Sequence, residues 1–198
     1  KPLILSPFTR DPELARQWFQ HFEGAGLDGI MAKRGELGYR PNERVMFKLK
    51  HRRTADCVVG GFRWAKNAQG KAVGSLLLGL YDKEGKLHHV GHTSSFKAKE
   101  KQELTQFLEP YRDSGGEASF GCGRTPGGPS RWSAGKDLSW ESLRPELVCE
   151  VHYDHLQGDR FRHAATFVRW RDDKAPATCA YDQLEVAVPY ELHKIFGA

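Results

Sequence analysis

Apolar and polar positions between residues 11 and 24 repeat with the spacing of a helix. Asp11 is a good N-cap, Pro12 suits the first helical position, and Glu13 is favourable near the positive end of the helix dipole. The apolar face consists of Leu14, Ala15, Trp18, Phe19 and Phe22. We predict a helix that begins after Asp11 and ends at Gly24, because glycine commonly terminates helices.

Two short apolar segments follow, at residues 30–32 and 45–49, and both predict strands. The intervening residues 35–44 are rich in Gly, Pro and Asn, as in a turn. Side chains alternate between the two faces of a strand. The second strand is therefore expected to place Lys48 and Lys50 on one face and its apolar side chains on the other.

The pattern changes after residue 53 and becomes mainly that of β-structure. Strands are predicted at residues 57–62, 73–81, 87–91, 147–153 and 166–170, and a helix is predicted at 96–108 with Leu104, Phe107 and Leu108 facing inward. This order matches a five-stranded oligonucleotide-binding (OB) barrel, which has a helix between its third and fourth strands. The expected fold class is α+β, mainly β.

Composition limits the classes of protein that need be considered. The 198 residues, 39% of them hydrophobic, suffice for one large domain, or one domain and part of another. Apolar stretches of membrane-spanning length and signal-peptide features are absent from the sequence, so we expect a soluble, intracellular protein. The four cysteines include no CxxC pair, which argues for buried, reduced thiols instead of structural zinc or a disulfide framework.

The positive charge is concentrated in one segment. Although the net charge is only +5, residues 33–53 contain eight basic and two acidic side chains. The basic residues are Lys33, Arg34, Arg40, Arg44, Lys48, Lys50, Arg52 and Arg53. Such focusing is typical of sites that hold phosphates, although a solvated basic hairpin would have the same composition.

Three segments carry candidate chemistry: residues 28–33, 47–50 and 169–174. The first begins with an acid and ends with a lysine, the second has two alternating lysines, and the third reads Arg-Trp-Arg-Asp-Asp-Lys. Each taken alone has an ordinary explanation, namely a turn, an exposed strand and surface charge.

Taken in order, the three segments resemble motifs IV, V and VI of the covalent nucleotidyltransferases, and most of all those of bacterial ATP-dependent DNA ligases of the short, repair-linked type. Family motif IV, Glu-Gly-(Val/Ile/Leu)-Met-(Val/Ala)-Lys, is matched by residues 28–33, with Asp28 in place of Glu. Motif V, Trp-x-Lys-x-Lys, is matched by Lys48 and Lys50, with Met46 in place of Trp. Motif VI, Arg-x-Arg-x-Asp-Lys, is matched by residues 169–174.

The sequence around the motifs agrees with this resemblance. Residues 53–61, Arg-Thr-Ala-Asp-Cys-Val-Val-Gly-Gly, are similar to the start of the ligase barrel. Residues 89–93 and 145–151 are similar to two further strands of that barrel, so the resemblance covers almost the whole chain. It implies two domains: residues 1–52 as the C-terminal part of the adenylation domain, and 53–198 as an OB-fold DNA-binding domain.

The resemblance also implies roles for individual residues. Lys48 and Lys50 would hold the α-phosphate of ATP or AMP, and Asp28 would position Mg²⁺. Arg171 and Lys174 would bind the β- and γ-phosphates, so that pyrophosphate leaves in line. The resemblance also assigns Lys33 to nucleotide binding and Arg169 and Asp173 to catalysis, and it implies a cytoplasmic, nucleoid-associated protein. The candidate DNA-binding residues are Arg52, Arg53, Lys97 and Lys99, although the last two would equally fit an ordinary solvated helix face.

The nucleophile motif of the family, Lys-x-Asp-Gly, does not occur in this sequence. The sequence contains one Asp-Gly pair, Asp28–Gly29, and Gly26 stands where the lysine would be. We therefore expect that this chain alone does not self-adenylate. An N-terminal adenylation half, in the same or a separate chain, would supply the nucleophilic lysine.

The expected substrate is nicked or broken double-stranded DNA, and no membrane partner is expected. Two alternatives remain open at this point. One is a stand-alone OB-fold nucleic-acid-binding protein, against which the hairpin at residues 28–50 argues. The other is an mRNA-capping guanylyltransferase, which shares motifs IV to VI.

Overall fold

The computed structural model describes residues 5–113, 119–121, 123–127, 137–184, 190–191 and 194–195. The chain forms two compact units, one made of Lys1–His51 with Glu185–Ala198 and the other of Arg52–Leu184. Within the first unit, the ring of Tyr190 packs against His21 and Phe22 at centroid distances of 6.4 and 5.8 Å.

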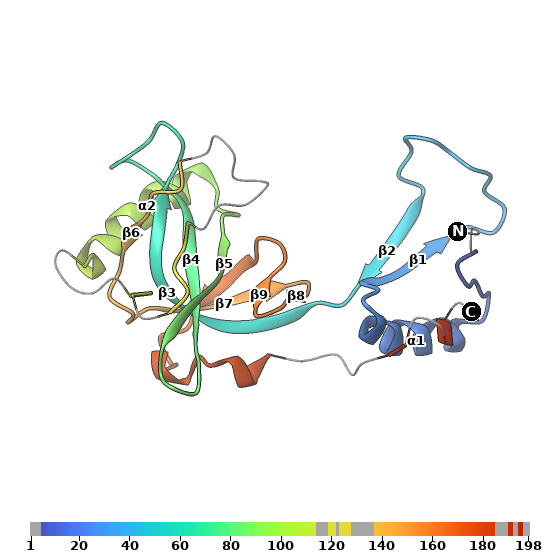
Figure 1. Ribbon diagram of the computed structural model, residues 1–198. Coiled ribbons are helices and arrows are strands. Elements are labelled where there is room, and N and C mark those ends of the chain that lie inside the picture. Colours follow the sequence, from blue (N-terminus) through green and yellow to red (C-terminus); the bar gives the residue numbers. More distant parts are fainter. Residues whose placement is uncertain are drawn as a thin grey trace. The chain divides into compact units, whose positions relative to one another are not determined.

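The first unit begins with helix α1, Pro12–His21 (Figure 1). Asp11 caps it as predicted, accepting a hydrogen bond from the backbone N–H of Glu13 at 2.9 Å. The predicted end at Gly24 is wrong, because the chain continues as a 3-10 helix over Phe22–Ala25. Gly26 ends this turn with a φ of 83°, a left-handed conformation that costs glycine little.

Strands β1, Gly29–Lys33, and β2, Met46–Lys50, form an antiparallel hairpin in the same unit. Gly29 is required where the strands meet, because its φ is 147° and a Cβ there would lie 1.9 Å from the carbonyl oxygen of Leu49. His51 connects the end of the hairpin to α1. Its ring stacks on Phe19, and its Nε2 lies 2.7 Å from the carbonyl oxygen of Phe19.

The second unit is built on a twisted antiparallel sheet of order β10-β7-β3-β4-β5 (Figure 1). The strands are β3 (Arg53–Trp64), β4 (Val73–Tyr81), β5 (Leu87–Thr93), β7 (Val148–Tyr153) and β10 (Thr166–Trp170). All five were predicted, and β4 and β10 have the predicted bounds. Strand β3 is longer than predicted because its first half pairs with β7 while its second half pairs with β4.

The two edge strands of this sheet approach each other. Thr93, at the end of β5, forms a parallel bridge with Ala165, just before β10. The N–H of Ala165 donates to the carbonyl oxygen of His92 at 2.9 Å, and the N–H of Phe167 donates to Oγ1 of Thr93 at 3.1 Å. These two hydrogen bonds connect the end of β5 to the start of β10.

The core of the second unit is formed mainly by β3, β4 and β7. Residues of β4 are buried on both faces, so this strand reads as a continuous apolar run instead of an alternating one. Helix α2, Ala98–Leu108, contributes Leu104 and Leu108 to the core. Phe107 was expected to face inward but is 40% exposed.

Three strands of two residues escaped prediction: β6 (Glu141–Ser142), β8 (Leu156–Gln157) and β9 (Arg160–Phe161). Ladders this short leave no periodicity to read.

Cys57, Cys149 and Cys179 are buried free thiols, as expected, and Cys122 lies outside the described residues. Among the helices that the structure describes, none is long and apolar enough to cross a membrane.

His89 on β5 is a partly buried histidine whose charged neighbours are all positive or titrate as cations. Burial, followed by the positive charge of Arg63, lowers its pKa to about 3. Its Nε2 has no hydrogen-bond partner among the described residues, and its ring packs edge-on against Phe120 at 5.7 Å. The same causes lower the pKa of His92. Both imidazoles are therefore held neutral inside the sheet.

This burial predicts a pH dependence of stability. Because the folded pKa of His89 lies below the unfolded value of about 6.5, the unfolded chain binds more protons as pH falls. The free energy of unfolding should decline between pH 7 and 5, with a limit of about 1.4 kcal/mol per pH unit for each such histidine. Urea unfolding of the wild type and His89→Gln across this range provides the test. Equal slopes for the two proteins would contradict it.

Candidate functional site

The first unit places a carboxylate between two lysines. Asp28 precedes β1, and its Oδ2 lies 3.1 Å from Nζ of Lys48 and 3.0 Å from Nζ of Lys50, both on β2. Hydrogen bonds from Lys50 and then Lys48 lower the pKa of Asp28 to about 2. The carboxylate is therefore ionised at neutral pH, and two ammonium groups converge on one oxygen.

The register of the hairpin determines which side chains share this face. Lys50 pairs with Gly29, Lys48 with Met31, and Lys33 with Met46. Since cross-strand partners point to the same side of a sheet, Lys33 lies on the same face as Lys48 and Lys50. It stands at the far end of β1 from Asp28, roughly 16 Å along the chain, so the structure does not bring it into the Asp28 cluster.

Both lysines are accessible enough to exchange partners. The side chain of Lys48 is 48% exposed and that of Lys50 is 34% exposed. The whole of β2 is open to solvent. Ion pairs of this kind contribute little to stability, because water competes for both charges. The cluster is better suited to meeting an anion than to holding the hairpin together.

The second unit contains another cluster, formed by motif VI and the start of β3. Nη1 of Arg171 lies 2.9 and 3.1 Å from the two carboxylate oxygens of Asp56. Nζ of Lys174 lies 2.7 Å from Oδ2 of the same carboxylate. Arg171 also makes a two-pronged contact with Asp173, from Nε at 2.8 Å and Nη2 at 2.9 Å.

Mutual pairing fixes the charge states of this cluster. The hydrogen bond from Arg171 lowers the pKa of Asp173 to about 2. In return, the hydrogen bond to Asp173 and the charge of Asp56 raise the pKa of Arg171 above its usual value. Asp173 is therefore ionised at neutral pH, and its two hydrogen bonds hold one edge of the Arg171 guanidinium.

Gln183 holds the backbone of Asp56 in place. Its Oε1 accepts a hydrogen bond from the Asp56 N–H at 2.8 Å, and its Nε2 donates to the Asp56 carbonyl oxygen at 3.0 Å. A second bond from Nε2 to the carbonyl oxygen of Ala180, at 2.9 Å, fixes the amide itself. One side chain thus satisfies both backbone groups of the residue that carries the carboxylate.

Arg169, the first residue of motif VI, pairs with a different carboxylate. It lies opposite Glu150 in the pairing of β10 with β7, and its Nε contacts Oε2 of Glu150 at 2.7 Å. The structure therefore separates the motif into a cluster around Asp56, which contains Arg171 and Lys174, and the outlying pair of Arg169 with Glu150.

The four residues predicted to bind DNA occur at two places in the second unit. Arg52 and Arg53 are its first residues, and Arg53 begins β3 opposite Tyr153. Lys97 precedes α2 as its N-cap, and Lys99 is in the first turn, 3.6 Å from Glu103.

Asp56 and Gln183 were missed by sequence reasoning. Asp56 could have been found, because it is an acid inside the apolar sequence Ala-Asp-Cys-Val-Val, where a charged residue calls for a partner. Gln183 left no signal, since its role depends on the chain folding back to β3.

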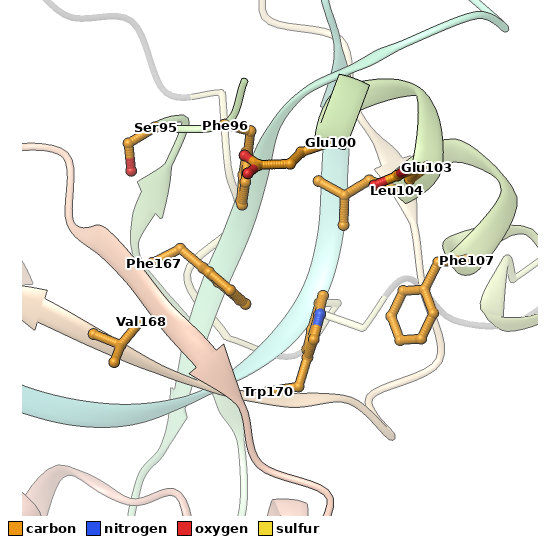
Figure 2. Close-up of a pocket in the computed structure, with 9 residues that line it drawn as sticks. All are labelled: Ser95, Phe96, Glu100, Glu103, Leu104, Phe107, Phe167, Val168 and Trp170. Carbon is orange, nitrogen blue, oxygen red and sulfur yellow. The ribbon is translucent and has the colours of Figure 1, made fainter. Parts of the chain in front are cut away.

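A pocket of about 560 Å³ lies between α2 and β10 (Figure 2). Its walls include the aromatic pairs Phe96–Phe167 and Phe107–Trp170, with ring centroids 5.5 and 4.9 Å apart. Figure 2 also shows two carboxylates, of Glu100 and Glu103, among its lining side chains. Aromatic walls offer no charge to a triphosphate, and the two carboxylates would repel it, so we assign no nucleotide to this pocket.

No group of three or more His, Cys, Asp or Glu side chains that could hold a metal occurs in the described part of the chain. A metal ion held by this chain at Asp28 would thus depend on one carboxylate. This is compatible with Mg²⁺, which commonly binds one or two carboxylates together with phosphate oxygens.

Comparison with known proteins agrees with these motifs. The family model described as "ATP dependent DNA ligase C terminal region" matches residues 69–174, more than half of the chain. DNA ligase C of Mycobacterium tuberculosis is 47% identical over 96% of this chain and 55% of its own length. DNA ligase C1 of Mycolicibacterium smegmatis is 45% identical over 94% of this chain and 53% of its own length.

The chain also resembles a solved structure, the ligase domain of LigD from M. tuberculosis. The TM-score is 0.51 at 26% identity, covering 83% of this chain and 51% of the other. The chain spans about half the length of the relatives it matches. Its mainly β architecture with few helices and the family match agree, and the chain belongs to the ATP-dependent DNA ligases, whose C-terminal region it matches.

Proposed function

We propose that this chain supplies the phosphate-handling part of an ATP-dependent DNA ligase that seals breaks during DNA repair. The observation that carries the proposal is the pair of cation clusters at the positions of motifs V and VI. Lys48 and Lys50 meet on Asp28, while Arg171 and Lys174 meet on Asp56. Family membership favours a ligase over a capping guanylyltransferase or a stand-alone binding protein.

The second unit is proposed to be an OB-fold barrel. Support comes from the strand order β10-β7-β3-β4-β5 and from the contacts of β10 with the end of β5. In chain order, five main strands with α2 after the third give the arrangement of that fold. The hairpin of the first unit, with exposed Phe47 (68%) and Leu49 (44%), is proposed to be part of the adenylation domain.

Lys48 and Lys50 would stabilise the α-phosphate at each step. In ligation a lysine attacks this phosphate of ATP, AMP passes to a DNA 5′-phosphate, and a 3′-hydroxyl displaces AMP. Negative charge on the phosphate oxygens grows or shifts at every step, so fixed cations nearby lower the barriers. A bound phosphate would replace Asp28 as the partner of the two lysine ammonium groups. The nucleophilic lysine itself would come from the adenylation half of the enzyme.

Asp28 would be released by that exchange to help hold Mg²⁺, together with phosphate oxygens. The bound ion would neutralise charge on the phosphates and orient them for in-line displacement. An ionised carboxylate is needed for this, and an aspartate released from its lysine partners, with an ordinary pKa of about 3.9, is still ionised at neutral pH.

Arg171 and Lys174 would act on the leaving group. They would bind the β- and γ-phosphates and so stabilise pyrophosphate as it departs. Arginine suits this task because its planar fork matches phosphate oxygens, while lysine acts as a point charge. Pyrophosphate is present during the first step only, which limits these residues to self-adenylation.

This division of labour predicts how substitutions in the complete ligase affect two steps. Arg171→Ala or Lys174→Ala should slow self-adenylation by about 10²- to 10³-fold, by analogy with removal of an oxyanion-hole donor. Closure of a nick that already carries AMP should change little. Lys48→Ala and Lys50→Ala should impair both steps, because the phosphate of AMP is present throughout. Labelling with ATP and single-turnover closure of a pre-adenylated nick measure the two rates.

Two controls define this experiment. The 198-residue chain alone, which lacks Lys-x-Asp-Gly, should take up no label from ATP. Lys66→Ala changes a lysine beyond the end of β3, outside both clusters, and should leave both rates unchanged. Equal slowing of both steps by the substitutions in motifs V and VI would refute the proposed division.

DNA binding is proposed to rely on backbone phosphates contacted by Arg52, Arg53, Lys97 and Lys99. Because such contacts release counterions, affinity should fall steeply between 50 and 200 mM salt, with the logarithmic slope decreasing by roughly one for each cation removed. Binding of the complete ligase to nicked duplexes of unrelated sequence, compared with Lys97→Ala and Lys99→Ala, measures this. A slope unaltered by these substitutions would contradict the assignment.

A further inference from the structure

We propose that Asp56 is a positioning residue for self-adenylation, which holds Arg171 and Lys174 in the arrangement that receives the leaving pyrophosphate. Its carboxylate contacts both cations, at 2.9 and 3.1 Å from Nη1 of Arg171 and 2.7 Å from Nζ of Lys174. The inference rests on the proposed function, since it assigns a role to a residue outside the ligase motifs.

Two carboxylates fix the plane of the Arg171 guanidinium. Asp56 contacts Nη1, whereas Asp173 contacts Nε and Nη2, so the group is held along two of its edges. A guanidinium has five N–H donors. Its four contacts with these carboxylates need at most four of them, which leaves a donor for a phosphate oxygen. Lys174 has three donors and uses one on Asp56.

The low exposure of the Asp56 carboxylate favours a role in supporting the two cations over a role in blocking them from phosphate. The side chain of Asp56 is 13% exposed, less than that of Arg171 at 19% or Lys174 at 26%. Asp56 is thus the least exposed of the three side chains, whereas Asp173, the other carboxylate on Arg171, is 65% exposed. A sheltered carboxylate such as Asp56 can keep its contacts while an anion binds to the remaining donors of the two cations.

The backbone that carries Asp56 is itself held firmly. Asp56 pairs with Glu150 of β7 in the sheet, and Gln183 bonds to both its N–H and its carbonyl oxygen. A carboxylate fixed in this way reduces the rotamer freedom that a long lysine or arginine side chain would otherwise lose on binding phosphate. Preorganisation of this kind favours the transition state, in which pyrophosphate charge develops.

The test measures self-adenylation of the complete ligase under single-turnover conditions over a series of ATP concentrations. Asp56→Ala should lower the maximal rate by about 10- to 100-fold, by analogy with residues that orient metal ligands. The ATP concentration for half-maximal rate and the closure of a pre-adenylated nick should each change by less than about threefold. Asp56→Asn retains one acceptor oxygen and should lose less.

Gln183→Ala tests the same idea without removing a charge, and should slow self-adenylation in the same direction but by less. Asp159→Ala is the matched control, since Asp159 is a carboxylate paired with an arginine, Arg124, elsewhere in the second unit. It should leave both steps unchanged. These two variants keep the proposal testable if Asp56→Ala folds poorly.

Three results would overturn the inference. A faster self-adenylation in Asp56→Ala would mean that the carboxylate masks the cations. Equal slowing of both steps by Asp56→Asn and Gln183→Ala would indicate a general structural role, and an unchanged rate in all variants would indicate none. By contrast, a wild-type complete enzyme that neither takes up label from ATP nor closes nicks would refute the proposed function.

Discussion

The pairing of Asp56 with motif VI connects residues 115 and 118 positions apart in the sequence. This contact depends on the sheet, because Asp56 lies on β3, Arg171 and Lys174 follow β10, and β7 lies between these strands. A partly buried charge needs a partner. The sheet therefore has to bring these chain segments together for the carboxylate and the two cations to be stable.

Each unit pairs one carboxylate with two cations, but the two carboxylates differ in their exposure to solvent. In the first, Asp28 is 39% exposed and holds Lys48 and Lys50 on an open hairpin. In the second, Asp56 is 13% exposed and is braced by Gln183. An exposed pair exchanges partners easily, whereas a sheltered one preserves geometry. This contrast agrees with the proposed roles, in which Lys48 and Lys50 bind the phosphate of AMP at every step, whereas Arg171 and Lys174 act only on pyrophosphate.

Two histidines of β5 show the opposite arrangement, in which partial burial is not balanced by an acid. His89 and His92 are held neutral inside the sheet, and their pKa values are lowered mainly by desolvation. Here the burial of a strand determines the chemistry of its side chains.

The sequence by itself determined the strand pattern, the helix cap at Asp11 and the three motifs, because these depend on spacing along the chain. It missed the end of α1, the two-residue strands, the exposure of Phe107 and the return of Tyr190 to the first unit. It also missed Asp56 and Gln183. The positions of Asp56, Gln183 and Tyr190 were decided by the tertiary structure, because they depend on contacts between residues far apart in sequence, about which local periodicity carries no information. The end of α1 and the two-residue strands are local features, but they are too short to show a periodicity.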